Sequence, residues 1–117
     1  FLAFARPDVR TAALAGGVEP YTAHTIVDPA ALASHVEDAR RRGYSIGTQG
    51  FEEGVDSVAA PILDTAGLSI GAVALAAPCS RVSGGDLDRY GALVAAASRE
   101  IGERLYGRAT TPQRKRA

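Results

Sequence analysis

The chain has 117 residues, a length that fits one domain. Its 46% hydrophobic and 22% charged residues exclude a disordered protein, and its formal net charge of zero gives no basic surface for nucleic acid. The single cysteine, Cys79, excludes an internal disulfide and a cysteine-rich metal site, and it favours a reducing, cytoplasmic setting. No apolar run reaches the roughly 18 residues of a membrane span, so no membrane partner is expected.

The first part of the chain predicts short helical segments. Residues 1–5 are apolar and are interpreted as the end of a helix, which Arg6-Pro7 stops because the residue before proline disfavours the α region. Asp8 is predicted to cap a short helix over residues 9–14, which ends at Gly16 and Gly17.

The clearest predicted helix follows Asp28. Asp28 is a suitable N-cap, and Pro29 falls at the first helical position, where its missing N–H costs nothing. Residues 40–42 are three arginines that complement the helix dipole in the last turn, and Gly43 is the expected residue after the helix.

The centre of the chain predicts strands. An extended segment begins at residues 44–46, and the glycine-rich residues 47–54 are interpreted as a loop or irregular strand. Residues 55–63 and 68–77 predict an antiparallel hairpin joined by a turn at residues 64–67. The second of these strands is apolar on both faces and is therefore predicted to be central and covered.

A long helix is predicted after the hairpin, capped by Ser83 or Asp86 and ending at Gly107. The apolar stripe of this helix consists of Leu87, Tyr90, Val94, Ala97, Ile101 and Leu105. We therefore predict a domain over residues 1–107 and a flexible basic tail over residues 108–117. Two strands alone do not stabilise a sheet this apolar, so the sequence indicates that further strands come from missing sequence or from a partner chain.

Four stretches in order resemble the IclR family of bacterial transcriptional regulators. Any one of the motifs is weak, but together they run through nearly the whole chain, from about Phe1 to Gly107. They are the threonine-rich segment at residues 21–32, the sequence Arg-Arg-Gly-Tyr-Ser at 41–45, the run from Glu52 to Ile62, and Ala-Pro-Cys-Ser-Arg at 77–81.

The resemblance implies the C-terminal effector-binding domain of such a regulator. It implies an α+β, GAF-like fold, in which helices flank an antiparallel or mixed sheet of about six strands. In that family a winged helix-turn-helix and the first strands of the domain precede the point where this chain starts. We therefore expect this chain to lack its first strands and to reach DNA only through a domain missing from it.

The resemblance also implies effector-binding residues on the concave face of the sheet. The family's polar anchors there are an acidic residue, a Cys or Ser, and two small hydroxylated residues. By motif they fall on Gly47 or Thr48, Ser57, Ala74 and Ala76. Only Ser57, and Thr48 if the register allows, keeps a polar side chain, so we expect an effector more apolar than a two- or three-carbon acid.

The sequence contains few features that indicate other functions. His24 and His35 are isolated histidines, interpreted as structural or surface residues, and no catalytic order, metal spacing or phosphate loop is present. A thiol-dependent reductase on the same fold would use several cysteines. We therefore predict a sensing and oligomerisation domain that is not an enzyme, needs no cofactor, binds a small organic effector and self-associates as a dimer or tetramer. The alternatives are a pure assembly module without a ligand and a truncated gene remnant.

Overall fold

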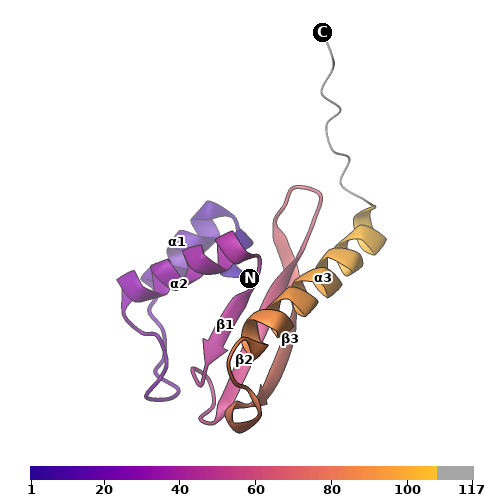
Figure 1. Cartoon of the computed structure of the whole chain (residues 1–117). Helices are drawn as coiled ribbons and strands as arrows, with labels where there is room; N and C mark the ends of the chain where they lie inside the picture. Colours follow the sequence, from indigo (N-terminus) through magenta and orange to yellow (C-terminus); the bar gives the residue numbers. More distant parts are fainter. Residues whose placement is uncertain (108–117) are drawn as a thin grey trace.

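A computed structural model describes residues 1–107 of the chain (Figure 1). The basic tail predicted for residues 108–117 lies outside the described residues. Helices come first along the chain, a three-stranded antiparallel sheet follows, and a long helix closes the described part. The fold is therefore α+β, as the sequence predicted.

The N-terminal segment contains a 3-10 turn, η1 (Leu2–Phe4), and a helix, α1 (Pro7–Ala15). The prediction that Asp8 caps this helix was wrong. The helix begins at Pro7, two residues before the predicted start, because Pro7 has no N–H to satisfy and its fixed φ suits the first helical position. Asp8 lies in the first turn instead, and its carboxylate accepts hydrogen bonds from the guanidinium of Arg6 at 2.7 and 3.2 Å.

Helix α2 (Pro29–Arg42) begins and ends where the sequence predicted. The Asp28 side chain accepts a hydrogen bond from the backbone N–H of Ala31 at 2.8 Å, which satisfies one of the amides that the first turn leaves without a partner. Gly43 ends the helix in the left-handed region, at φ 84°, where a side chain would be strained. The chain therefore turns directly from α2 into the sheet.

The sheet has the order β1 (Ser45–Thr48), β2 (Val55–Leu63) and β3 (Ser69–Pro78), and both neighbouring pairs are antiparallel. The predicted hairpin is confirmed, and β1 extends two residues into the segment interpreted as a loop or irregular strand. In the turn between β2 and β3, the Asp64 carboxylate accepts hydrogen bonds from the N–H groups of Ala66 and Leu68 at 2.9 and 3.0 Å.

The position of β3 differs from the prediction. Within the described residues β3 is an edge strand that pairs with β2 alone, and Ala72, Ala74 and Ala76 are exposed. The expectation of a central, covered strand rested on its apolar sequence. No described segment of this chain supplies the neighbour and the cover that such a sequence requires.

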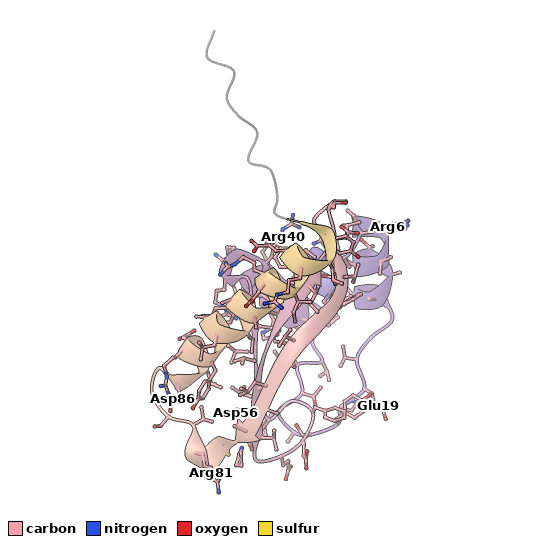
Figure 2. All side chains as sticks on the ribbon, turned by 90° about the vertical axis from the view of Figure 1, so that its right-hand side faces the viewer. Arg6, Glu19, Arg40, Asp56, Arg81 and Asp86 are labelled. Carbon is pink, nitrogen blue, oxygen red and sulfur yellow. The ribbon has the colours of Figure 1, made fainter. Side chains whose placement is uncertain are left out.

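Helix α3 (Asp86–Tyr106) packs across one face of the sheet and forms the core with it. Val58 and Ala60 are each 1% exposed beneath Val94 of the helix. Close packing depends on Gly91, since a Cβ atom at this position would lie 2.3 Å from the ring of Tyr44. Figure 2 shows α3 on one side of the sheet, with α1 and the loop that carries Glu19 on the other.

Helix α3 ends at Gly107, as the sequence predicted, but its start and the burial of its apolar stripe differ from the prediction. Gly85 is the N-cap and has no side chain, whereas Asp86 lies in the first turn and accepts a hydrogen bond from the N–H of Ser83 at 3.1 Å. Neither predicted residue therefore caps the helix with its side chain. The apolar stripe is buried only in its first half, and Ile101 and Leu105 are exposed because no described segment packs over them.

Candidate functional site

The two faces of the sheet have different surroundings. The face beneath α3 carries Tyr44, Ile46, Val58, Ala60 and Val73, which pack into the core. We call it the helix face. Successive side chains of a strand point to opposite sides, so the residues between these lie on the other face, which we call the open face.

Most of the residues predicted to bind an effector lie together on the open face. The register pairs Gly47 with Ser57 and Ser57 with Ala76, so these three residues form one row across all three strands. Residues directly opposite one another in antiparallel strands share a face. Ala74 pairs with Ala59 in the next row, on the same face.

Thr48 does not join this row. It follows Gly47 directly in β1 and pairs with Asp56, so alternation directs its side chain toward the helix face. The structure thus separates the two positions that the motif alone left as alternatives. Gly47 is the one that shares a face with Ser57, and it carries no side chain.

Contact between Gly47 and Ser57 is close. A Cβ atom on Gly47 would lie 2.7 Å from the Oγ atom of Ser57, so this hydroxyl lies over the glycine. A serine hydroxyl both donates and accepts hydrogen bonds. Ala74 and Ala76 add only exposed methyl groups beside it. The row therefore offers one polar side-chain group, the Ser57 hydroxyl.

A cavity of about 430 Å³ lies between α2, the preceding loop and β1, and it shares only Gly47 with this row. Both histidines line it, although from the sequence we interpreted them as isolated residues. His35 comes from α2 and His24 from the loop, and Asp38 and Arg42 of α2 lie beside them. The helical spacing of residues 35, 38 and 42 was visible in the sequence. The position of the loop that brings in His24 was not.

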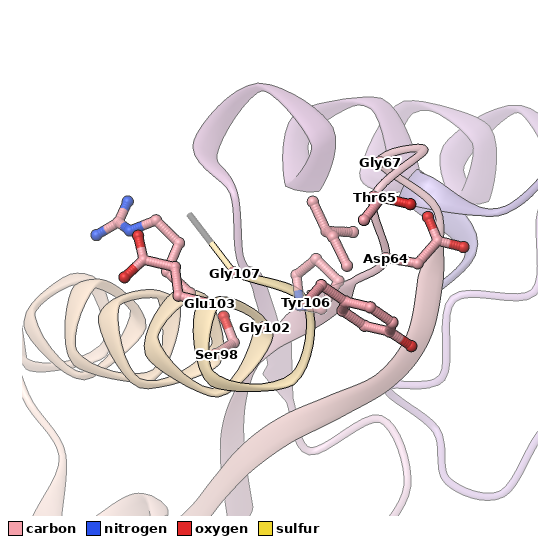
Figure 3. A pocket seen from close by; sticks show the side chains of 11 residues that line it. Asp64, Thr65, Gly67, Ser98, Gly102, Glu103, Tyr106 and Gly107 are labelled. Carbon is pink, nitrogen blue, oxygen red and sulfur yellow. The ribbon is translucent and has the colours of Figure 1, made fainter. Parts of the chain in front are cut away.

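A second cavity, of about 600 Å³, lies between the end of α3 and the turn joining β2 to β3 (Figure 3). Pro61 and Leu63 line it together with Gly102 and Tyr106. None of the residues predicted to bind an effector belongs to its lining. Its walls come from a helix end and a hairpin turn, so it is separate from the row on the open face.

One polar contact joins the helix face to α3. The hydroxyl of Tyr44 donates a hydrogen bond to the Asp88 carboxylate at 2.8 Å. Because this bond exists only while the phenol is protonated, it raises the pKa of Tyr44 above its ordinary value of 10.0.

Residues 1–107 contain no group of three or more His, Cys, Asp or Glu side chains placed to hold a metal ion, and no helix long and apolar enough to cross a membrane.

Comparison with known families adds a decisive observation. The family described as "Bacterial transcriptional regulator IclR C-terminal" matches residues 1–103. The chain belongs to the IclR family. It is 34% identical over 101 residues to the HTH-type transcriptional regulator BhcR of Paracoccus denitrificans, covering 86% of this chain and 36% of that protein. It is 31% identical over 87 residues to the Pca regulon regulatory protein of Pseudomonas putida, covering 74% and 30%.

Solved IclR-type structures share the fold. A putative IclR regulator from Silicibacter sp. TM1040 superposes with a TM-score of 0.83 at 34% identity, covering 95% of this chain and 43% of that one. The C-terminal domain of KdgR from Escherichia coli gives 0.78 at 29%, covering 92% and 65%. The inducer-binding domain of PobR from Acinetobacter, a double mutant in complex with 3-hydroxybenzoic acid, gives 0.73 at 24%, covering 86% and 59%.

The chain is thus an effector-binding domain of IclR-type transcriptional regulators, which are not enzymes, as the sequence predicted. It spans about a third of the length of the curated relatives it matches. The match corresponds to their C-terminal part.

Proposed function

We propose that the open face binds a small organic effector at the row formed by Gly47, Ser57 and Ala76, with Ala74 beside it. The observation that carries the proposal is the convergence of these motif positions on one face of the sheet, with the Ser57 hydroxyl at their centre. Ser57 orients a polar group of the effector, and the alanines leave space for its apolar body.

The chemistry of the row indicates the class of effector. Gly47, Ala74 and Ala76 supply no side-chain donor for a carboxylate, and a buried charge without donors is costly. We therefore propose an aromatic or alicyclic acid, or a neutral compound of similar size, rather than a two- or three-carbon acid. The complex of the related PobR domain with 3-hydroxybenzoic acid supports an aromatic acid as the first probe.

Effector binding would act on DNA through assembly. We propose that the domain self-associates as a dimer or tetramer, and that the effector has different affinities for two arrangements of the subunits. A winged helix-turn-helix elsewhere in the regulator then changes its fit to a two-fold symmetric operator. The apolar side chains exposed along α3 favour self-association, and those of Leu93 and Leu105 are each 61% exposed.

The test fills the open face without disturbing the core. Ala74→Leu places a larger side chain there, and Ala92→Leu is a matched control on the exposed side of α3. Thermal unfolding is followed with a panel of aromatic and alicyclic acids that includes 3-hydroxybenzoate. We expect the natural chain and Ala92→Leu to be stabilised to the same extent, and Ala74→Leu to be stabilised less. Equal stabilisation of all three chains would place the effector elsewhere, and no stabilisation by any acid would contradict the acid class.

A second candidate function is assembly without a ligand. The exposed stripe of α3 and the unpaired outer edge of β3 favour it, since both are surfaces on which another segment could pack. Sedimentation of the natural chain and of a variant with Leu93→Glu and Leu105→Glu measures how far association depends on these leucines. Thermal unfolding with the panel of acids measures whether any compound binds, and the two results together separate the two functions. Association that depends on these leucines, in a chain that no compound stabilises, would favour pure assembly.

A further inference from the structure

The cavity bounded by α2, the loop at residues 22–26 and β1, which we call the α2–β1 cavity, runs along the outer edge of the sheet. Ile46, Gly47 and Thr48 all line it. Because these three consecutive residues point to alternate faces, a cavity that touches all of them lies along the edge of β1 rather than on one face. This edge has no neighbouring strand among the described residues.

Two backbone amides of this edge, in residues that line the cavity, point away from the sheet. The N–H of Gln49 donates to the carbonyl of Val55 at 3.0 Å and continues the register of β1 with β2. Gly47, two residues earlier, directs its backbone groups toward β2 in the same way. In an antiparallel pair the alternate residues face outward, so the N–H groups of Ile46 and Thr48 point away from β2. Neither donates to a turn or loop carbonyl in the part of the chain that the structure describes.

The walls of the cavity are held in place. The hydroxyls of Thr22 and Thr25 donate to the carbonyls of Gln49 and Gly50, each at 2.6 Å, and tie the loop to the end of β1. On the other side, α2 packs against β1 and η1, and its Ala39 is buried. A site whose walls are fixed before binding loses little entropy when a ligand enters.

The polar lining favours an anion. His24, His35 and Arg42 supply nitrogen donors, and Asp38 is the one carboxylate in the lining. The Asp38 charge is compensated by an ion pair with Arg41. The guanidinium of Arg42 lies 5.5 Å from the centre of the Tyr44 ring and has no carboxylate partner among the described residues.

Much of the remaining lining is apolar. Ile26 of the loop, Leu32 of α2 and Ile46 of β1 provide three branched side chains beside the donors. The volume of about 430 Å³ falls in the range, about 300–1,000 Å³, of pockets that hold small organic molecules. Apolar walls with donors grouped at one side match a molecule with an apolar body and one anionic end.

We propose that the α2–β1 cavity is a second ligand site, which binds a small organic monocarboxylate with an apolar body. Arg42, the two histidines and the outward amides of Ile46 and Thr48 take the carboxylate, and the branched side chains hold the body. This site goes beyond the proposed effector site, with which it shares only Gly47. A ligand on the edge of β1 would restrain Gly47 and so couple the two sites.

The test follows benzoate binding to the natural 117-residue chain by amide chemical shifts. We expect the amides of Ile46 and Thr48 to shift, with a dissociation constant of about 1 mM or below. Arg42→Gln should weaken binding about tenfold or more, since it removes a charge-assisted hydrogen bond. Arg40→Gln is the matched control, because Arg40 lies in the same last turn but does not line the cavity.

Further variants separate this site from the open face. His35→Gln should also weaken benzoate binding, and Ala74→Leu should leave it unchanged. Benzyl alcohol, which has the same ring without the charge, should bind more weakly. Loss of binding in Ala74→Leu but not in Arg42→Gln would overturn the proposal and favour the open face. Equal effects of Arg40→Gln and Arg42→Gln would also overturn it, as would no shifts at about 10 mM benzoate.

Discussion

The Oγ atom of Ser57 lies 2.7 Å from the position that a Cβ atom would take on Gly47, its partner on the neighbouring strand. The backbone of Gly47 is not in the left-handed region, so space rather than conformation excludes a side chain there. The family resemblance places an acidic residue at Gly47 or Thr48. At Gly47 the hydroxyl of Ser57 occupies the space that any side chain would enter.

This contact predicts coupling between the two positions. Gly47→Ala should destabilise the natural chain by about 1 kcal/mol, because Ser57 must leave its side-chain conformation. In a Ser57→Ala background the same substitution should cost little, since the Oγ atom is gone. Urea unfolding of the four proteins in this double-mutant cycle measures the coupling. Additive effects would show that the two side chains do not compete for the space.

Gly91→Ala should destabilise the protein, although alanine is ordinarily the better helix former by about 1 kcal/mol. Its Cβ atom would lie 2.3 Å from the ring of Tyr44, and overpacking of this kind costs about 1–3 kcal/mol. In a Tyr44→Ala background the substitution should become neutral or favourable. Thermal unfolding measures the effect of Gly91→Ala on stability in the natural chain and in the Tyr44→Ala background. A stabilising Gly91→Ala in the natural chain would mean that α3 does not approach β1 as closely as the structure shows.

Tyr44 should titrate above its ordinary pKa of 10.0, because it donates a hydrogen bond to Asp88 in its protonated form. With a pKa higher in the folded than in the unfolded state, its contribution to stability is present below about pH 10 and is lost as the pH rises through the folded pKa. Ultraviolet titration of the tyrosines measures the Tyr44 pKa, and comparison with Tyr44→Phe identifies the signal of Tyr44. Asp88→Asn should lower the Tyr44 pKa, and an unchanged titration would show that the bond is not formed in solution.

Asp28→Ala should destabilise the protein by about 1 kcal/mol, because it leaves the amide of Ala31 without its acceptor. Asp28→Asn keeps an acceptor oxygen and should cost much less, which makes it the matched control. Guanidinium unfolding compares the three proteins. The same pair also tests the α2–β1 cavity, since fraying of α2 should weaken benzoate binding in Asp28→Ala more than in Asp28→Asn.

Local signals in the sequence predicted much of the fold correctly. The bounds of α2 followed from Asp28, Pro29 and Gly43, since caps and stops act within one turn of the helix. The hairpin of β2 and β3 followed from two apolar runs around a turn at Asp64. Errors arose where two local signals competed, as at the start of α1, where Pro7 rather than Asp8 decided the first residue.

The family and its motif positions were also readable in the sequence, because order and spacing of residues are properties of the chain itself. Only the tertiary structure decided that Gly47 faces Ser57 while Thr48 does not, since strand register fixes which side chains share a face. It alone decided that the alanines on the open face of β3 are exposed and that His24 and His35 line one cavity. Those relationships depend on contacts between residues far apart in the sequence, which no local pattern records.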